Sequence, residues 1–72
     1  MKNKYKIIDD FQAGNTGYRV LVLDRDFSSF EEAPEQIAVI EGNEYEFSLN
    51  SVRSWVIIKS REKFVGKNII FK

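Results

Sequence analysis

The sequence contains neither cysteine nor histidine among its 72 residues. Without cysteine there are no disulfides, thiolate metal ligands or cysteine nucleophiles, and the chain suits a reducing compartment. Without histidine, the Ser-His-Asp and Cys-His catalytic arrangements and the usual zinc sites are excluded. These absences remove most common enzyme designs. A chain this short has room for one small core, so we expect a single non-enzymatic domain over residues 1–72.

Long hydrophobic runs are also missing. The longest runs, such as Trp55-Val56-Ile57-Ile58, have four residues, far below the roughly 20 needed to cross a bilayer. Residues 1–6 contain three lysines, and only two isoleucines separate them from Asp9-Asp10. This apolar stretch is too short for the apolar region of a signal peptide. We therefore expect a cytoplasmic protein with no membrane contact. Isoleucine, lysine and asparagine supply 20 of the 72 positions, which favours a bacterial or phage source.

Strand-forming residues dominate what is present. Valine, isoleucine, threonine and the aromatic residues fill 25 of 72 positions, whereas alanine and leucine fill three each, and this balance favours strands. We predict an all-β fold, a small antiparallel barrel or bent sheet of five or six strands, similar in architecture to SH3-like and OB-like barrels. Alternation of apolar and polar residues is clearest at 44–49, and the other strands are predicted at 5–9, 18–24, 36–41, 54–60 and 68–71.

One segment is a candidate helix. Ser28 with Glu31, or Ser29 with Glu32, has the spacing of a capping box. Because the only proline, Pro34, disfavours helical geometry at the residue before it, the helix would be about one turn long. We expect a short helical turn near 28–33 or an acidic loop. An α+β fold with one helix on the sheet is the alternative.

Turn chemistry and alternation give a register and a core. The pair Gly42-Asn43 between two strands predicts a two-residue hairpin loop, which sets Ile40 opposite Tyr45. The apolar run at 18–24 does not alternate, which is typical of a strand covered on both faces. The predicted interior comprises Val20, Val22, Ile40, Tyr45, Phe47, Leu49, Trp55, Ile57 and Ile70.

Charge is balanced overall but unevenly distributed. Residues 1–23 carry four cations and two carboxylates (+2), residues 24–46 one cation and eight carboxylates (−7), and residues 47–72 six cations and one carboxylate (+5). We expect these segments to cancel on the folded surface, because neighbouring strands of opposite charge pair favourably. The candidate acidic surface comprises Asp24, Asp26, Glu31, Glu32 and Glu35.

The basic C-terminal third also contains the single tryptophan. If Trp55 is exposed, its indole and the nearby cations form a stacking and phosphate-neutralising surface for single-stranded nucleic acid. A lone tryptophan in a small domain is more often a core residue. The candidate surface for nucleic acid or another partner comprises Arg53, Trp55, Lys59, Arg61, Lys63 and Lys67.

No catalytic residues, metal ligands or cofactor are predicted. Asp24 and Asp26 share one face of an extended chain, but a third ligand at calcium-loop spacing is missing. The leading hypothesis is a small binding module that acts by protein–protein contact, as a regulatory, accessory or inhibitor protein. The alternative is a barrel that binds single-stranded nucleic acid. We also expect a protein partner or a homodimer, through a sheet edge or an apolar patch, because the chain has more apolar surface than 72 residues easily cover.

Overall fold

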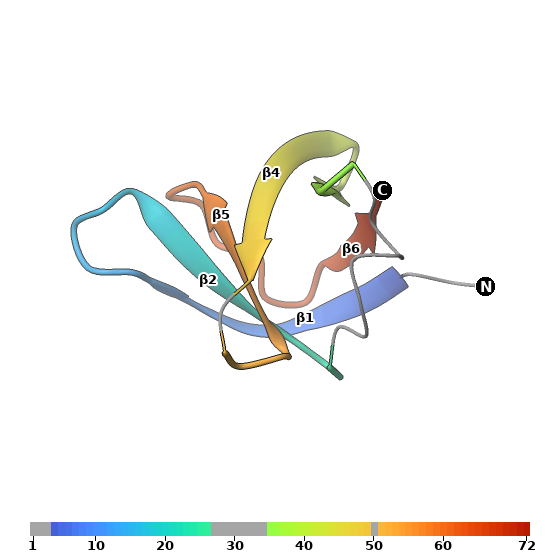
Figure 1. Cartoon of the computed structure of the whole chain (residues 1–72), viewed down its shortest axis with the longest axis horizontal. Coiled ribbons are helices and arrows are strands. Elements are labelled where there is room, and N and C mark those ends of the chain that lie inside the picture. Colours follow the sequence, from blue (N-terminus) through green and yellow to red (C-terminus); the bar gives the residue numbers. More distant parts are fainter. Residues whose placement is uncertain (1–3, 27–34, 50) are drawn as a thin grey trace.

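The computed structural model describes residues 4–26, 35–49 and 51–72. The described residues form six antiparallel strands that close into a barrel in the order β1-β2-β5-β4-β3-β6 (Figure 1). The predicted small all-β barrel is therefore confirmed, whereas the expected helical turn at 28–33 lies outside the described residues. The strands are β1 (Lys4–Gln12), β2 (Tyr18–Leu23), β3 (Ile37–Ile40), β4 (Asn43–Leu49), β5 (Trp55–Lys59) and β6 (Asn68–Phe71).

Two strands close the barrel by changing neighbours along their length. The start of β1 pairs with β6, and its remainder pairs with β2 after a register shift between Ile7 and Asp9, where a bulge bends the strand. The first half of β4 pairs with β3, and residues 47–49 pair with β5. Figure 1 shows the resulting arch of β4. No helix in the described part of the chain has the length and hydropathy to span a membrane.

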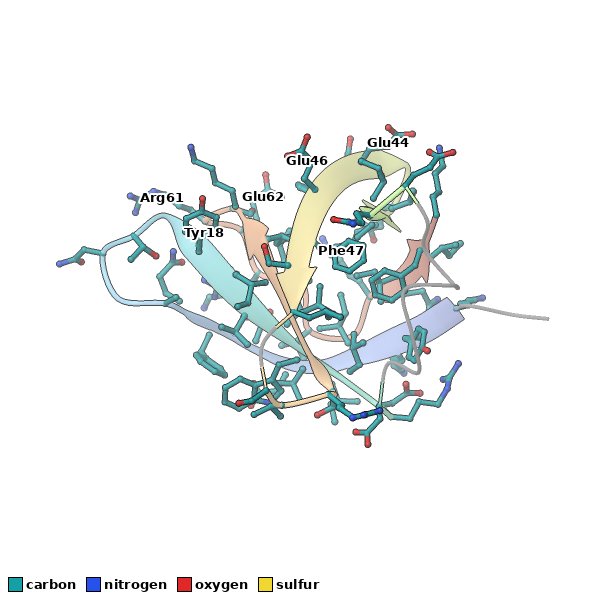
Figure 2. The ribbon with its side chains drawn as sticks, viewed as in Figure 1. Tyr18, Glu44, Glu46, Phe47, Arg61 and Glu62 are labelled. Carbon is teal, nitrogen blue, oxygen red and sulfur yellow. The ribbon has the colours of Figure 1, made fainter. Side chains whose placement is uncertain are left out.

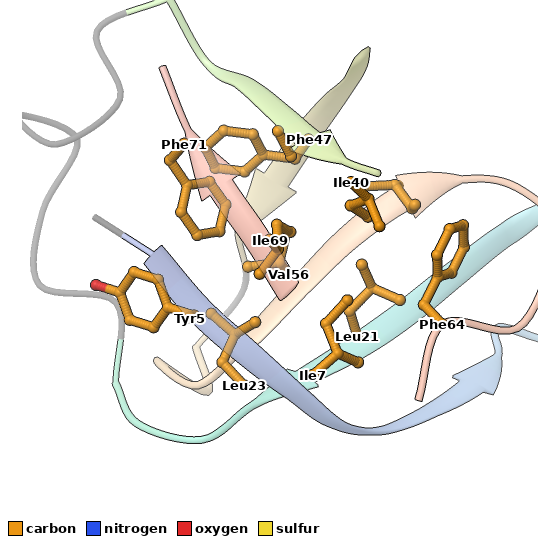
Figure 3. Packing of buried hydrophobic residues seen from close by; sticks show 12 residues of the cluster. Tyr5, Ile7, Leu21, Leu23, Ile40, Phe47, Val56, Phe64, Ile69 and Phe71 are labelled. Carbon is orange, nitrogen blue, oxygen red and sulfur yellow. The ribbon is translucent and has the colours of Figure 1, made fainter. Parts of the chain in front are cut away.

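The barrel encloses one apolar core (Figure 3). Three aromatic rings pack together at one end of it, where Phe71 is edge-on to Tyr5 and Phe47 at centroid distances of 5.4 and 5.0 Å. Removing these side chains from water is the main favourable contribution to folding. The core comprises Tyr5, Ile7, Leu21, Leu23, Ala38, Ile40, Phe47, Val56, Ile58, Phe64, Ile69 and Phe71.

The predicted interior is correct for β3 and β4, and Val20 of β2 is buried as predicted, but the prediction is wrong for Val22, Trp55, Ile57 and Ile70. Ile40 and Phe47 are buried, and Tyr45 and Leu49 pack against the core. By contrast, Ile70 of β6 is 43% exposed. In β2 and β5, Val20, Val22, Trp55 and Ile57 alternate with the core residues and lie on the outer face of the barrel. The reason is that these strands carry apolar residues on both faces, so alternation does not distinguish inside from outside.

The β3–β4 hairpin turns one residue earlier than predicted. Ile40 pairs with Asn43 and Ala38 with Tyr45, so Glu41-Gly42 is the two-residue loop. Both loop residues have positive φ angles, 52° and 84°, as a type I′ turn requires. The observed pairing differs from the predicted one by two residues, so the same side chains still face inward.

We expect Gly42→Val to lower the free energy of unfolding by about 1 to 3 kcal/mol. No atom lies within 4 Å of a Cβ built at this glycine, so the loss comes from the positive φ alone. Gly42→Asn is the matched control, because asparagine tolerates this conformation better. Thermal denaturation should give the lowest Tm for the valine variant, and an unchanged Tm would contradict the turn.

A buried ion pair fixes the end of the barrel beside the loop that follows β5. Arg19 is only 7% exposed, and its Nη2 lies 2.8 Å from Asp10 Oδ1. Its Nε donates to the same oxygen at 3.0 Å, and its Nη1 donates to Gln12 Oε1 at 2.6 Å. The second carboxylate oxygen of Asp10 accepts the backbone N–H of Phe64 at 2.7 Å. The pair therefore joins β1, β2 and the loop that carries Phe64 into the core.

Asp10→Asn should lower the free energy of unfolding by about 3 to 5 kcal/mol, because it leaves a buried guanidinium without a counter-ion. The control is Asp24→Asn in the exposed Asp24–Arg25 pair, whose side chains are 39% and 51% exposed. We expect that control to lose less than about 1 kcal/mol. Urea denaturation of both variants measures the difference, and equal losses would show that the buried pair has no special role.

Candidate functional site

The outer surface of β1, β2 and β5 carries a second apolar cluster. Phe11 pairs with Val20, and Val20 pairs in turn with Ile57. The rings of Phe11 and Trp55 meet edge to face with their centroids 5.1 Å apart. Val20 is 5% exposed although it lies outside the barrel. We name this surface the outer apolar face and define it as Phe11, Tyr18, Val20, Val22, Trp55 and Ile57.

Part of the outer apolar face is open to solvent. Phe11 and Tyr18 are 40% and 45% exposed, and Val22, Trp55 and Ile57 are half-buried. Trp55 is therefore neither a core residue nor a freely exposed one. The cluster is separate from the core, which β1, β2 and β5 fill with their alternate side chains.

We expect Phe11→Ala to shift the tryptophan emission to longer wavelength and to increase quenching by acrylamide, because it removes the ring packed on Trp55. Val65→Ala is the control, since Val65 is 54% exposed in the loop before β6. Its emission should match that of the unmodified protein. An unchanged spectrum in Phe11→Ala would contradict the packing of the two rings.

A groove of about 500 Å³ adjoins the outer apolar face. Tyr18 and Ile57 belong to both surfaces. Figure 2 shows Tyr18 and Glu46 on the same side of the barrel, on neighbouring parts of its surface. Among the described residues, three charged side chains and four apolar or aromatic ones line the groove: Glu35, Glu46 and Lys59, and Tyr18, Ile37, Phe47 and Ile57.

The predicted basic surface is spread over several parts of the barrel. Lys59 lines the groove, and Arg61 and Lys63 are exposed in the loop that follows it. Arg53 precedes β5, at the opposite end of that strand from Lys59. Lys67 lies 3.2 Å from Glu41 and stands over the ring of Phe64.

The predicted acidic residues are also separated. Asp24 lies after β2, where it contacts Arg25 at 3.2 Å and accepts the backbone N–H of Lys6. Asp26 is exposed beside them, whereas Glu35 lines the groove. Glu31 and Glu32 lie outside the described residues.

Carboxylates of the acidic middle segment pair with cations of the basic third. Lys72 Nζ lies 2.7 Å from Glu44 Oε2, and Lys67 contacts Glu41. The hydrogen bond and charge of Glu44 raise the pKa of Lys72, with a smaller contribution from Glu35. Part of the charge segregation therefore cancels on the folded surface.

Within residues 4–26, 35–49 and 51–72, no group of three histidine, cysteine or carboxylate side chains could hold a metal ion. A second groove of about 400 Å³ lies beside β3 and β6, next to the Lys67–Glu41 contact.

Sequence reasoning missed Phe11 and Tyr18, which lie at the ends of their strands, where the alternation of apolar and polar residues gives no clear signal.

Comparison of the chain with protein families, curated proteins and solved structures finds no match. Its function must therefore be inferred from the two surfaces described above.

Proposed function

We propose that this protein is a small non-enzymatic binding module whose outer apolar face contacts a partner protein. The observation that supports the proposal most strongly is an aromatic cluster on the outside of a barrel that already has a separate core. Contiguous exposed apolar patches mark interaction surfaces, and aromatic side chains dominate the energetics of protein interfaces. We propose a regulatory, accessory or inhibitor role. We place it in the cytoplasm, a reducing compartment to which a chain without cysteine is suited.

Side-chain docking is favoured over strand addition. Each described strand has a strand neighbour on either side in the closed barrel, and closure leaves only short stretches of open edge, in β1 and β4, to which another strand could pair. An apolar patch is therefore the better candidate of the two association surfaces expected from the sequence. Phe11 and Tyr18 offer the most exposed aromatic area on it.

The test is retention of proteins from a cell extract on the immobilised chain. We expect at least one protein to be retained and to be lost, by more than about tenfold, with Phe11→Ser or Tyr18→Ser, as is typical of aromatic interface residues. Ile70→Ser is the matched control, because Ile70 is 43% exposed on β6, outside the outer apolar face. Equal retention by all variants, or no retained protein, would contradict the proposal.

Single-stranded nucleic acid is the alternative partner. Tyr18 pairs with Lys59 on the outer surface, and an aromatic ring beside a cation is a recurrent contact for unstacked bases. Glu35 and Glu46 line the adjacent groove, however, and their charge opposes the approach of a polyanion.

We therefore expect weak or no binding to labelled single-stranded RNA or DNA at about 0.15 M salt. A fluorescence titration with 12-nucleotide probes measures this. Micromolar or tighter binding that Arg53→Ala and Trp55→Ala weaken would make nucleic acid the better assignment. An RNase-treated extract in the retention experiment separates a protein partner from one held through RNA.

A further inference from the structure

We propose that the groove beside the outer apolar face receives an arginine or lysine side chain of the partner protein. This inference rests on the proposed function, because it assigns the chemistry of the partner segment that extends beyond the outer apolar face. The two surfaces are continuous through Tyr18 and Ile57, so one short peptide segment can contact both.

The shape and the lining of the groove suit a long cationic side chain. Its volume of about 500 Å³ lies within the range of small-ligand sites. Ile37, Ile57 and the ring of Tyr18 provide apolar walls. Arginine and lysine bury an aliphatic stem against such walls and keep their charged end near polar groups. The ring of Tyr18 can also attract a cation placed over its face.

The charges at the groove are complementary to a cation. The described part of the 24–46 segment has four glutamates, which lie in β4 or next to β3, and two of them, Glu41 and Glu44, pair with Lys67 and Lys72. The other two, Glu35 and Glu46, line the groove, and neither forms an ion pair within the described residues. Among the described residues, Lys59 is the one cation that lines the groove, so the described lining carries a net charge of −1. A cationic side chain is therefore favoured over a phosphate or a carboxylate.

The probes are two peptides, acetyl-Leu-Arg-Leu-amide and acetyl-Leu-citrulline-Leu-amide. Citrulline has nearly the shape of arginine but no charge, and the leucines are provided for the outer apolar face. In a ¹⁵N NMR titration of the whole chain at low salt, we expect shifts at the amides of Ile37, Ser48 and Ile57. The arginine peptide should bind about two- to fivefold more tightly, as for a solvent-exposed ion pair.

Glu46→Gln and Glu35→Gln should each reduce or abolish the preference for the arginine peptide over the citrulline peptide. Glu44→Gln is the matched control, because Glu44 lies on the same strand but pairs with Lys72. Equal binding of both peptides to the unmodified protein would overturn the inference. So would an equal effect of Glu44→Gln, or shifts confined to residues outside the groove. Shifts of the same amides by a single-stranded oligonucleotide, but not by the peptides, would assign the groove to nucleic acid instead.

The retention experiment separates failure of this inference from failure of the proposed function. If a partner is lost with Phe11→Ser but held equally by Glu35→Gln and Glu46→Gln, the outer apolar face binds a protein and the groove does not select a cation. If no variant alters retention, the proposed function itself is wrong.

Discussion

The ion pair between Asp10 and Arg19 is the constraint on which much of the barrel depends. Both side chains lie inside the molecule, where a charge is stable only with its partner and its hydrogen bonds in place. The loop at residues 60–67 has no regular structure of its own, yet Asp10 holds its Phe64 N–H. Phe64 then reaches Tyr45 edge to face at 5.8 Å. This ion pair therefore holds β1 and β2 together and positions the loop residue Phe64 in the core.

The core and the outer apolar face share the same strands without sharing side chains. In β2, Leu21 and Leu23 face inward while Val20 and Val22 face outward. Such a strand usually needs cover on both sides. Here the outer side is covered only in part, by the contact of Phe11 with Trp55. The core stabilises the barrel from within, and Phe11 and Tyr18 on the outer apolar face remain 40% and 45% exposed.

Sequence reasoning succeeded where local patterns decide the structure. Alternation located β4, and glycine marked the β3–β4 hairpin, where Gly42 has a positive φ of 84°. It failed where both faces of a strand carry apolar residues, as in β2, β5 and β6. It also missed Phe64, because a loop rich in charge gives no sign that one ring turns inward. The groove has no sequence signature, since Tyr18, Glu35 and Lys59 meet only when distant strands close the barrel.

The change of neighbours along β4 links the groove to the stability of the whole barrel. Glu46 is the last residue paired with β3 and Phe47 the first paired with β5, so the groove opens where the two partner strands diverge. A side chain bound in the groove would contact Ile37 of β3 and Ile57 of β5, and so would resist a change of angle at this corner. Because binding to the folded state alone raises stability, occupancy of the groove would make the whole barrel harder to unfold.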